Sequence, residues 1–145
     1  MANNEEVIDS PVGRVNKHIH EYVATNGAQG HDWRGYPTLL LTTRKRISGK
    51  LRRTALIYGR DGENVILVAS QGGAPRHPLW YLNLSHDPHV EVQIRGETLT
   101  GWARTATPAE RPRLWQMMAR LYPPYDSCQA KARREIPVVI VEPAK

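Results

Sequence analysis

Residues 37–60 read PTLLLTTRKRISGKLRRTALIYGR, in which two β-favouring runs, 37–43 and 54–60, flank a strongly cationic segment. Six of the ten residues from 44 to 53 are arginine or lysine. Short apolar runs bounded by polar residues are typical of strands, so the stretch predicts a β-hairpin with a cationic turn. Arginine suits bidentate contact with phosphate or carboxylate, which makes an anionic ligand one expectation for this hairpin. A solvated charged turn without a ligand is the other.

Further runs downstream also have the composition of strands: 63–70, 89–94, 98–106 and 136–143. Asp61 and Gly62 favour a tight hairpin turn between two of the runs. Six strands joined mostly by short turns favour a closed antiparallel barrel, because closure removes exposed sheet edges. We therefore predict an α+β fold, a six-stranded antiparallel barrel with an N-terminal helix and flanking helices.

Helical patterns precede and interrupt these strands. Residues 10–27 begin with serine and proline, carry apolar residues at helical spacing and end at a glycine, whereas residues 1–9 are expected to be flexible. Further helices are expected at 77–84, at 107–122 after a capping box, and at 125–134. The N-terminal helix is amphipathic, which fits packing on the domain or, as the alternative, peripheral contact with a membrane.

Composition limits the possibilities further. The 145 residues are enough for one domain with a core, so a single domain over 1–145 is expected. Lysine and arginine exceed aspartate and glutamate by 20 − 14 = 6, which favours anionic partners. One cysteine, Cys128, excludes an internal disulfide and fits a reducing compartment. Without a long apolar run or a signal-like N-terminus, a cytoplasmic location is expected, with membrane association as the open alternative.

A second polar loop, Ser70-Gln71-Gly72-Gly73, follows the run 63–70, and Trp80 and Tyr81 come soon after it. Paired glycines allow a backbone to approach a ligand closely. The two rings serve either as a platform for a ligand or as core residues. A cationic hairpin, a glycine loop and an aromatic segment together predict a site for a large anionic cofactor with a flat ring.

Tyr122 and Tyr125 flank two prolines in a break between predicted helices. A phenol in such a place either hydrogen-bonds a substrate oxygen or simply packs. The six histidines show no metal-ligand spacing, so no metal site is expected. Neither a G-x-S-x-G element nor a Walker or Rossmann glycine fingerprint occurs. If the chain is an enzyme, its chemistry is expected to come from an organic cofactor.

Three blocks of sequence carry a family resemblance: 37–56 with its cationic hairpin, 69–92, and 136–139. The second block contains GGAPRHPLWYLNL and is the most specific of the three. Over about residues 36–143 the chain resembles the deazaflavin (coenzyme F420)-dependent nitroreductases of actinobacteria, which belong to the split β-barrel FMN-binding superfamily.

The resemblance implies a split barrel that binds coenzyme F420. It also implies hydride transfer from the reduced coenzyme to an electron-poor acceptor such as a quinone, an enone or a nitroaromatic. In the family, the hairpin holds the coenzyme's phosphate and oligoglutamate tail, and the segments matching 68–71 and 79–83 line the deazaflavin. The cofactor-binding residues carried over are Arg46, Ile47, Ser48, Gly49, Arg52, Arg53, Thr54, Ala55, Leu56, Ile57, Val68, Ala69, Ser70, Gln71, Leu79, Trp80, Tyr81, Leu82 and Asn83. Ser70 and Tyr125 match positions that face the acceptor and are the candidate proton donors or orienters.

The chain departs from the family pattern at several positions. The usual glycine and lysine of the hairpin are replaced by Lys45 and Ile47. Gln71 stands where many members have a lysine that contacts phosphate, and Ala55 replaces a proline. Cys128 stands where some members have a third tyrosine, so the acceptor pocket is expected to be altered.

Two other kinds of function stay open on the sequence alone. The first is an FMN-binding reductase on the same barrel, although FMN has one phosphate and no glutamate tail and needs fewer cations. The second is a non-enzymatic module, either a coenzyme carrier or a basic nucleic-acid-binding domain. The aromatic residues are not interleaved with the cations, which argues against nucleic acid. The expected partner is a small-molecule acceptor, and the chain is expected to be a monomer or a homodimer.

Overall fold

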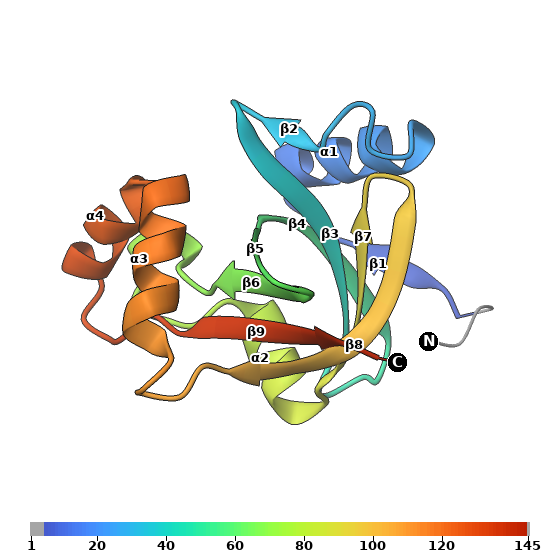
Figure 1. Cartoon of the computed structure of the whole chain (residues 1–145). Coiled ribbons are helices and arrows are strands. Elements are labelled where there is room, and N and C mark those ends of the chain that lie inside the picture. Colours follow the sequence, from blue (N-terminus) through green and yellow to red (C-terminus); the bar gives the residue numbers. More distant parts are fainter. Residues whose placement is uncertain (1–4, 145) are drawn as a thin grey trace.

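The computed structural model describes residues 5–144 (Figure 1). The elements are β1 (Val7–Asp9), α1 (Gly13–Ala24), β2 (Asp32–Trp33), β3 (Tyr36–Arg44), β4 (Leu51–Ile57), β5 (Gly59–Asp61), β6 (Asn64–Val68), a 3₁₀ turn η1 (Gln71–Gly73), α2 (Leu79–His86), β7 (His89–Ile94), β8 (Glu97–Thr105), α3 (Arg111–Leu121), α4 (Pro124–Lys131) and β9 (Val138–Pro143). All six predicted strand runs form strands, and the predicted helices all exist with shifted ends.

Within residues 5–144 the strands form one sheet in the order β1-β4-β3-β7-β8-β9-β6-β5, with β2 paired to β3. The predicted β3–β4 hairpin is confirmed, and Thr42 lies opposite Arg53. The predicted α+β class with flanking helices is confirmed, but the predicted strand number and the closure of the barrel were wrong. Residues 5–144 contain nine strands in an open sheet, in which only β1 and β4 pair in parallel. The chain breaks its strand at Tyr58, so that β4 pairs with β3 while β5 pairs with β6 at the far end of the order.

Side chains alternate across the sheet and bury both of its faces. Leu39 and Leu41 of β3 share an interior cluster with residues of β6, β7 and β9, whereas Leu40 faces α1. Strands far apart in the sheet order meet in that one cluster, so the sheet curls around it. Ile66 and Val68 of β6 point outward and pack against α3 and α4. Burial on both faces explains why β6 and β9 read as continuous apolar runs.

The N-terminal segment differs from the prediction. Residues 7–9, expected to be flexible, form β1 because they pair with the first three residues of β4; residues 1–4 lie outside the described residues. The Ser10 backbone N–H donates to the Arg53 carbonyl at 2.9 Å and keeps Ser10 in the extended segment. The helix therefore begins at Gly13, three residues later than predicted.

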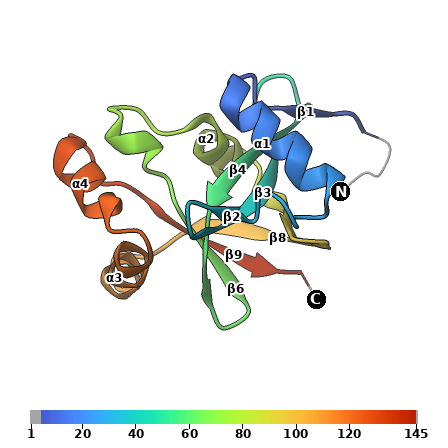
Figure 2. The ribbon, with the colours of Figure 1, turned by 90° about the horizontal axis from the view of Figure 1, so that it is seen from above.

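Helix α1 packs on the outer face of β3 and β4, and α3 and α4 pack on the outer face of β6 and β9, well apart from α1 (Figure 2). Tyr22 is completely buried against Leu40 of β3. Its hydroxyl donates to the Thr38 carbonyl at 3.1 Å and accepts the Arg95 N–H at 2.7 Å, which ties α1 to the β7–β8 turn. These contacts confirm that the predicted N-terminal helix packs on the domain.

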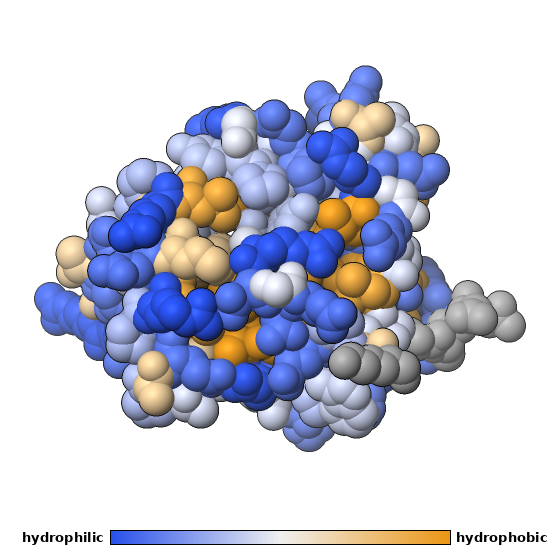
Figure 3. Space-filling model, viewed as in Figure 1, coloured by the Kyte–Doolittle hydropathy of each residue, from blue (hydrophilic) through white to orange (hydrophobic). Residues whose placement is uncertain are grey.

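On the face seen in Figure 3, apolar residues reach the surface only in separate areas between polar ones. Over the described part of the chain, no helix combines the length and the apolar character needed to cross a membrane. No cluster of three or more histidine, cysteine, aspartate or glutamate side chains there is suited to a metal ion.

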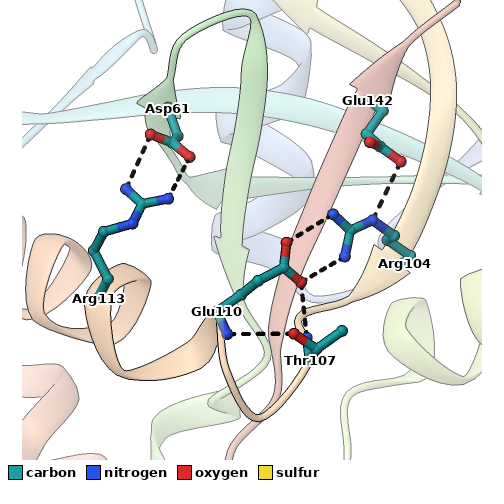
Figure 4. A network of polar contacts seen from close by, with 6 residues as sticks. All are labelled: Asp61, Arg104, Thr107, Glu110, Arg113 and Glu142. Carbon is teal, nitrogen blue, oxygen red and sulfur yellow. Dashed lines mark hydrogen bonds and ion pairs between the residues drawn. The ribbon is translucent and has the colours of Figure 1, made fainter.

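Helix α3 is preceded by the predicted capping box, which Figure 4 shows. The Thr107 N–H donates to the Glu110 carboxylate at 2.9 Å, and the Glu110 N–H donates to the Thr107 hydroxyl at 3.3 Å. The same carboxylate receives a two-pronged contact from Arg104 of β8, at 2.7 and 2.9 Å. Arg104 also reaches Glu142 of β9 at 3.2 Å, so one guanidinium joins α3 to two strands.

This network predicts a pH dependence of stability. Hydrogen bonds from Arg104 and then Thr107 lower the pKa of Glu110 from 4.5 to about 2. A lowered carboxyl pKa stabilises the fold above the unfolded value of 4.5 and loses that effect as the pH falls through about 2. We expect Glu110→Gln to lower Tm at pH 7, and we expect its difference from wild type to shrink between pH 4.5 and 2.

Thermal unfolding followed by circular dichroism across that pH range measures the difference. Glu97→Gln is the control, since Glu97 is an exposed carboxylate at the start of β8, away from the network. A Tm difference for Glu110→Gln that stays constant with pH would contradict the role assigned to the Arg104 contact.

Candidate active site

A cleft of about 840 Å³ lies along the outer edge of β4. Its walls come from α1, the β2–β3 turn, η1, α2 and the residues around the break between α3 and α4. Cofactor and substrate sites commonly have volumes of roughly 300–1,000 Å³, so the cleft has the size of a functional site.

The predicted cofactor residues fall into three groups. Eleven line the cleft: Arg52, Thr54, Ala55, Leu56, Ile57, Val68, Ser70, Gln71, Leu79, Trp80 and Asn83. Four line a separate hollow of about 350 Å³ at the hairpin tip: Arg46, Ile47, Ser48 and Gly49. The other four line neither: Arg53, Ala69, Tyr81 and Leu82. Both predicted catalytic residues, Ser70 and Tyr125, line the cleft.

Arg52 and Arg53 are neighbours on β4 but point to opposite faces of the strand. Arg52 lines the cleft and forms no ion pair within residues 5–144. Arg53 instead donates to the Asp9 carboxylate through Nε at 2.7 Å and through Nη2 at 3.2 Å. Its charge is therefore engaged by β1, and of these two arginines only Arg52 faces the cleft.

The backbone of β4 also faces the cleft. The Arg53 carbonyl points away from β3, along the plane of the sheet, and accepts the Ser10 N–H. The Tyr58 N–H points the other way, toward β3, and donates to the Pro37 carbonyl. Because peptide groups alternate in direction along a strand, the N–H and C=O groups of Ala55 and Ile57 also point away from β3. β1 pairs only with Leu51–Arg53, so this stretch of edge stays open to a ligand.

The cleft has a one-sided charge distribution. Its cationic side chains are Arg14, Arg34 and Arg52, and no aspartate or glutamate of the described residues lines it. A cleft lined by one sign of charge concentrates ligands of the opposite sign. The site is therefore suited to an anionic ligand.

Tyr125 lines the cleft and carries a hydroxyl that can donate a hydrogen bond. The side chain is only 5% exposed, yet within residues 5–144 its hydroxyl has no hydrogen-bond partner and is not sealed from solvent. Burial, reinforced by neighbouring Tyr122 and Cys128, raises the pKa of Tyr125 well above its usual range. The group is therefore a neutral O–H at physiological pH. The Ser70 hydroxyl likewise has no partner among these residues.

Aromatic rings form a row at this end of the cleft. The Tyr125 ring lies 4.9 Å from that of Tyr122, which lies 4.7 Å from Tyr36 and 6.5 Å from Trp33. Trp33 was not predicted as a site residue. The sequence offered one signal for it, a pair of aromatic residues flanking Arg34 and Gly35 just before the β3 run.

Arg134, which the sequence did not single out, holds the glycine loop in place. Its guanidinium donates to the carbonyls of Ala69, Ser70 and Ala74 at 3.0–3.2 Å and lies 2.9 Å from His77 Nδ1. One side chain thus fixes the backbone on both sides of η1. An arginine in an irregular segment after a helix has no local pattern that would reveal such a contact.

The two loop glycines have different roles. Gln71, Gly72 and Gly73 all have positive φ, at 45°, 65° and 82°. A Cβ on Gly73 would lie 2.8 Å from the Cys128 carbonyl oxygen, whereas a Cβ on Gly72 would have nothing within 4 Å. Gly73 therefore permits close packing on α4. Only Gly72 lines the cleft and leaves room for a ligand.

A matched pair of alanine substitutions tests this difference. Gly72→Ala should cost about 1 kcal/mol of unfolding free energy, since alanine at positive φ is strained. Gly73→Ala should cost at least about 1 kcal/mol more, because the Cys128 backbone must move as well. Urea unfolding of both variants measures the difference. Equal costs would show that α4 does not constrain Gly73.

Helix α2 supplies both ligand-facing and structural residues. Leu79 and Trp80 line the cleft, and Leu79 is 60% exposed. The Asn83 side-chain amide donates to the Thr43 hydroxyl at 3.2 Å, and its oxygen accepts the Arg46 N–H at 3.3 Å. Asn83 therefore fixes the hairpin against α2. The hydroxyl of Tyr81 is instead paired with that of Thr105 at 2.7 Å.

The hairpin tip is partly neutralised by the N-terminal segment. Glu5 forms a two-pronged ion pair with Arg44, at 2.8 and 2.9 Å, and this contact lowers the pKa of Glu5. Ile47, which stands in place of the family's lysine, is 89% exposed. Arg46 remains without an ion pair in the described segment, so it is the tip arginine available to an anion.

A sequence model of the F420H(2)-dependent quinone reductase family matches residues 14–143. The chain belongs to this family. An F420H(2)-dependent quinone reductase of Mycobacterium tuberculosis is 39% identical over 127 residues, which cover 83% of each chain. The solved F420-H2 dependent reductase FDR-A is 40% identical, with a TM-score of 0.68 over 73% of this chain and 94% of that one.

A further solved chain, described as a domain-swapped dimer, is 36% identical with a TM-score of 0.71, and the match covers 92% of this chain and all of that one. Membership of the family confirms the resemblance found in the sequence. This F420H2-dependent quinone reductase family member is therefore an enzyme that uses reduced coenzyme F420 as its hydride donor. The family membership favours the F420 prediction over the FMN-reductase alternative.

Proposed function

We propose that this enzyme holds reduced F420 along the edge of β4 and reduces a quinone that lies beside Tyr125. The observation that carries the proposal is the hydroxyl of Tyr125, a residue that lines the cleft. Among residues 5–144 this neutral donor has no partner and no carboxylate lines the cleft. The curled sheet supports assigning the fold as a variant of the split barrel.

The residues present fit the coenzyme. The flat ring would lie against Trp80 and Leu79 with its polar edge on the open backbone of Ala55 and Ile57, which offers both donors and acceptors. Arg52 would hold the phosphate. The oligoglutamate tail would continue to the hairpin tip, where Arg46 is available. Gln71, in place of the family's lysine, contributes hydrogen bonds without charge, so Arg52 has a larger share of the anion binding.

Reduced F420, when bound, supplies the hydride. The chain's own residues orient the acceptor and stabilise the charge that forms on it. As the quinone ring takes up two electrons, negative charge develops on its oxygen, and the Tyr125 O–H donates a hydrogen bond to that oxygen. Because burial raises its pKa, Tyr125 is assigned as a hydrogen-bond donor that keeps its proton. The proton that completes the quinol would then be taken from solvent. The Ser70 hydroxyl is the second donor available to the acceptor.

Two measurements test the proposal. Fluorescence titration of the purified protein with F420 and with FMN should give micromolar or tighter binding of F420 and far weaker binding of FMN. Mixing the enzyme with reduced F420 and a naphthoquinone should then restore the absorbance of oxidised F420. Failure to bind F420 would show that Ile47 and Gln71 have cost the site its cofactor. Binding without oxidation by the quinone would overturn the acceptor class.

A further inference from the structure

The β2–β3 turn presents an arginine to the cleft. Asp32 pairs with Pro37 and Trp33 with Tyr36, so only Arg34 and Gly35 connect the strands. Both connecting residues have positive φ, at 54° and 88°. The Gly35 N–H donates to the Asp32 carboxylate at 2.6 Å, which holds the turn closed.

Arginine is an unusual residue in this place. A two-residue hairpin turn with positive φ at both positions favours asparagine, aspartate or glycine first and glycine second. A long side chain is strained there, and Arg34 is exposed, so burial in the core does not explain its presence. Residues that break a local rule without a packing reason are expected where function requires them.

Arg34 lies at the far end of the aromatic row. Its guanidinium carbon sits 4.9 Å from the centre of the Trp33 ring, and that ring is 6.5 Å from Tyr122. Tyr122 in turn contacts Tyr125, the donor assigned to the acceptor's reacting oxygen. These rings are tilted to one another by 49° and 68°, so they form a wall of the cleft that connects Tyr125 to Arg34. An acceptor whose reacting oxygen is at Tyr125 would point its remote edge along this wall toward Arg34.

No carboxylate competes for this cation. The nearby Asp32 accepts the Gly35 N–H and forms no ion pair with Arg34, and across residues 5–144 no other acidic side chain pairs with Arg34. Arg14 of α1 lines the same cleft, also without an ion pair in that part of the chain. Within residues 5–144, the cations at this end of the cleft thus have no carboxylate partner.

We propose that Arg34 is a specificity-determining residue that favours quinones carrying an anionic substituent, a carboxylate or a sulfonate, on the edge remote from the reacting carbonyl. The proposal rests on the proposed function, because it takes Tyr125 as the contact of the reacting oxygen. Trp33 and Tyr122 support the ring, and Arg34 pairs with the anion, with Arg14 adding charge of the same sign.

The test compares 1,4-naphthoquinone with its 6-sulfonate, whose anion is on the ring remote from the two carbonyls, as acceptors for reduced F420. The readout is the ratio of kcat/KM for the sulfonate to kcat/KM for the neutral quinone. Arg34→Asn should lower this ratio about fivefold, and Arg34→Lys should retain most of it, since an exposed pair contributes a factor of this order. Asparagine suits the positive φ of the turn, so loss of folding does not explain the change.

Arg60→Asn is the matched control, because it removes the same charge from an exposed arginine on β5 outside the cleft. Its ratio should equal that of wild type. Raising the salt concentration should reduce the ratio in wild type and hardly affect it in Arg34→Asn. A ratio unchanged by Arg34→Asn would overturn the proposal. So would a weaker F420 affinity in that variant with the ratio intact, because the anion would then belong to the coenzyme.

Calorimetric titration with the two quinones separates this inference from the proposed function. Wild type should bind the sulfonate about fivefold more tightly than the neutral ring, and Arg34→Asn should lose that preference. This loss in a protein that reduces neither quinone would support the subsite and overturn only the proposed activity. Equal binding of both quinones by wild type would overturn the subsite, whatever the turnover.

Discussion

Replacing Tyr125 by phenylalanine is expected to lower kcat for quinone reduction about a hundredfold, close to 2.7 kcal/mol, with little change in F420 affinity. The substitution removes one oxygen from a buried ring and leaves the ring's packing in place. It deletes a neutral O–H donor that has no other partner in the described residues and faces the cleft. Steady-state kinetics with reduced F420, and F420 titration of the same preparation, give the two numbers.

Tyr58→Phe is the matched control. Its hydroxyl is also buried and is paired with the His31 ring at 2.8 Å, away from the cleft. That variant should lose stability and keep its kcat. If Tyr125→Phe instead lowers kcat and F420 affinity by the same factor, Tyr125 supports the packing of the site and does not orient the acceptor.

The second large effect is expected from Arg52→Ala, which should raise the Kd for F420 about thirtyfold, equivalent to about 2 kcal/mol. Arg52 lines the cleft and has no carboxylate partner among residues 5–144, and the neighbouring Gln71 adds no positive charge to the cleft. A charged donor to phosphate typically contributes about 1.5–3 kcal/mol. Fluorescence titration with F420 measures the change.

The adjacent substitution Arg53→Ala removes an identical charge from the opposite face of β4. Because Arg53 is paired with Asp9, its loss should destabilise the attachment of β1 and change the Kd for F420 less than about twofold. Equal weakening by both substitutions would mean that F420 senses only the total charge of the hairpin. Arg52 would then lose its assignment as a direct phosphate contact.

The sequence was sufficient for elements whose signal is local. Strands β6 and β9 have continuous apolar runs because both of their faces are buried. Thr107 and Glu110 are three residues apart, the spacing of the capping box that precedes α3. Strands β1 and β2 have three and two residues, too few for any periodicity to show. They form because the longer strands β4 and β3 have unpaired backbone groups with which β1 and β2 pair. Such free edges exist only in the assembled sheet.

The sequence predicted which residue types form the site, but not which of the cations face the cleft and which are paired elsewhere. The hairpin's cations look equivalent along the chain, and the structure divides them by strand alternation and by partners 39 and 44 residues away, Glu5 and Asp9. Arg134 is 64 residues from the Ser70 carbonyl that it holds. Long-range pairs of this kind leave no trace in local sequence, which is why Arg134 was missed.

Strand β1 has a practical consequence for handling the protein. Residues 1–9 contain three acidic residues, so a preparation trimmed before Ser10 would carry a formal charge of 6 + 3 = +9. It would also free the guanidinium groups of Arg44 and Arg53. Such a preparation should keep more nucleic acid of the bacterial expression host bound to it through a heparin column. Its ratio of absorbance at 260 nm to 280 nm should therefore be higher. The affinity of the trimmed protein for a polyanion would then reflect its added positive charge and not its cofactor site.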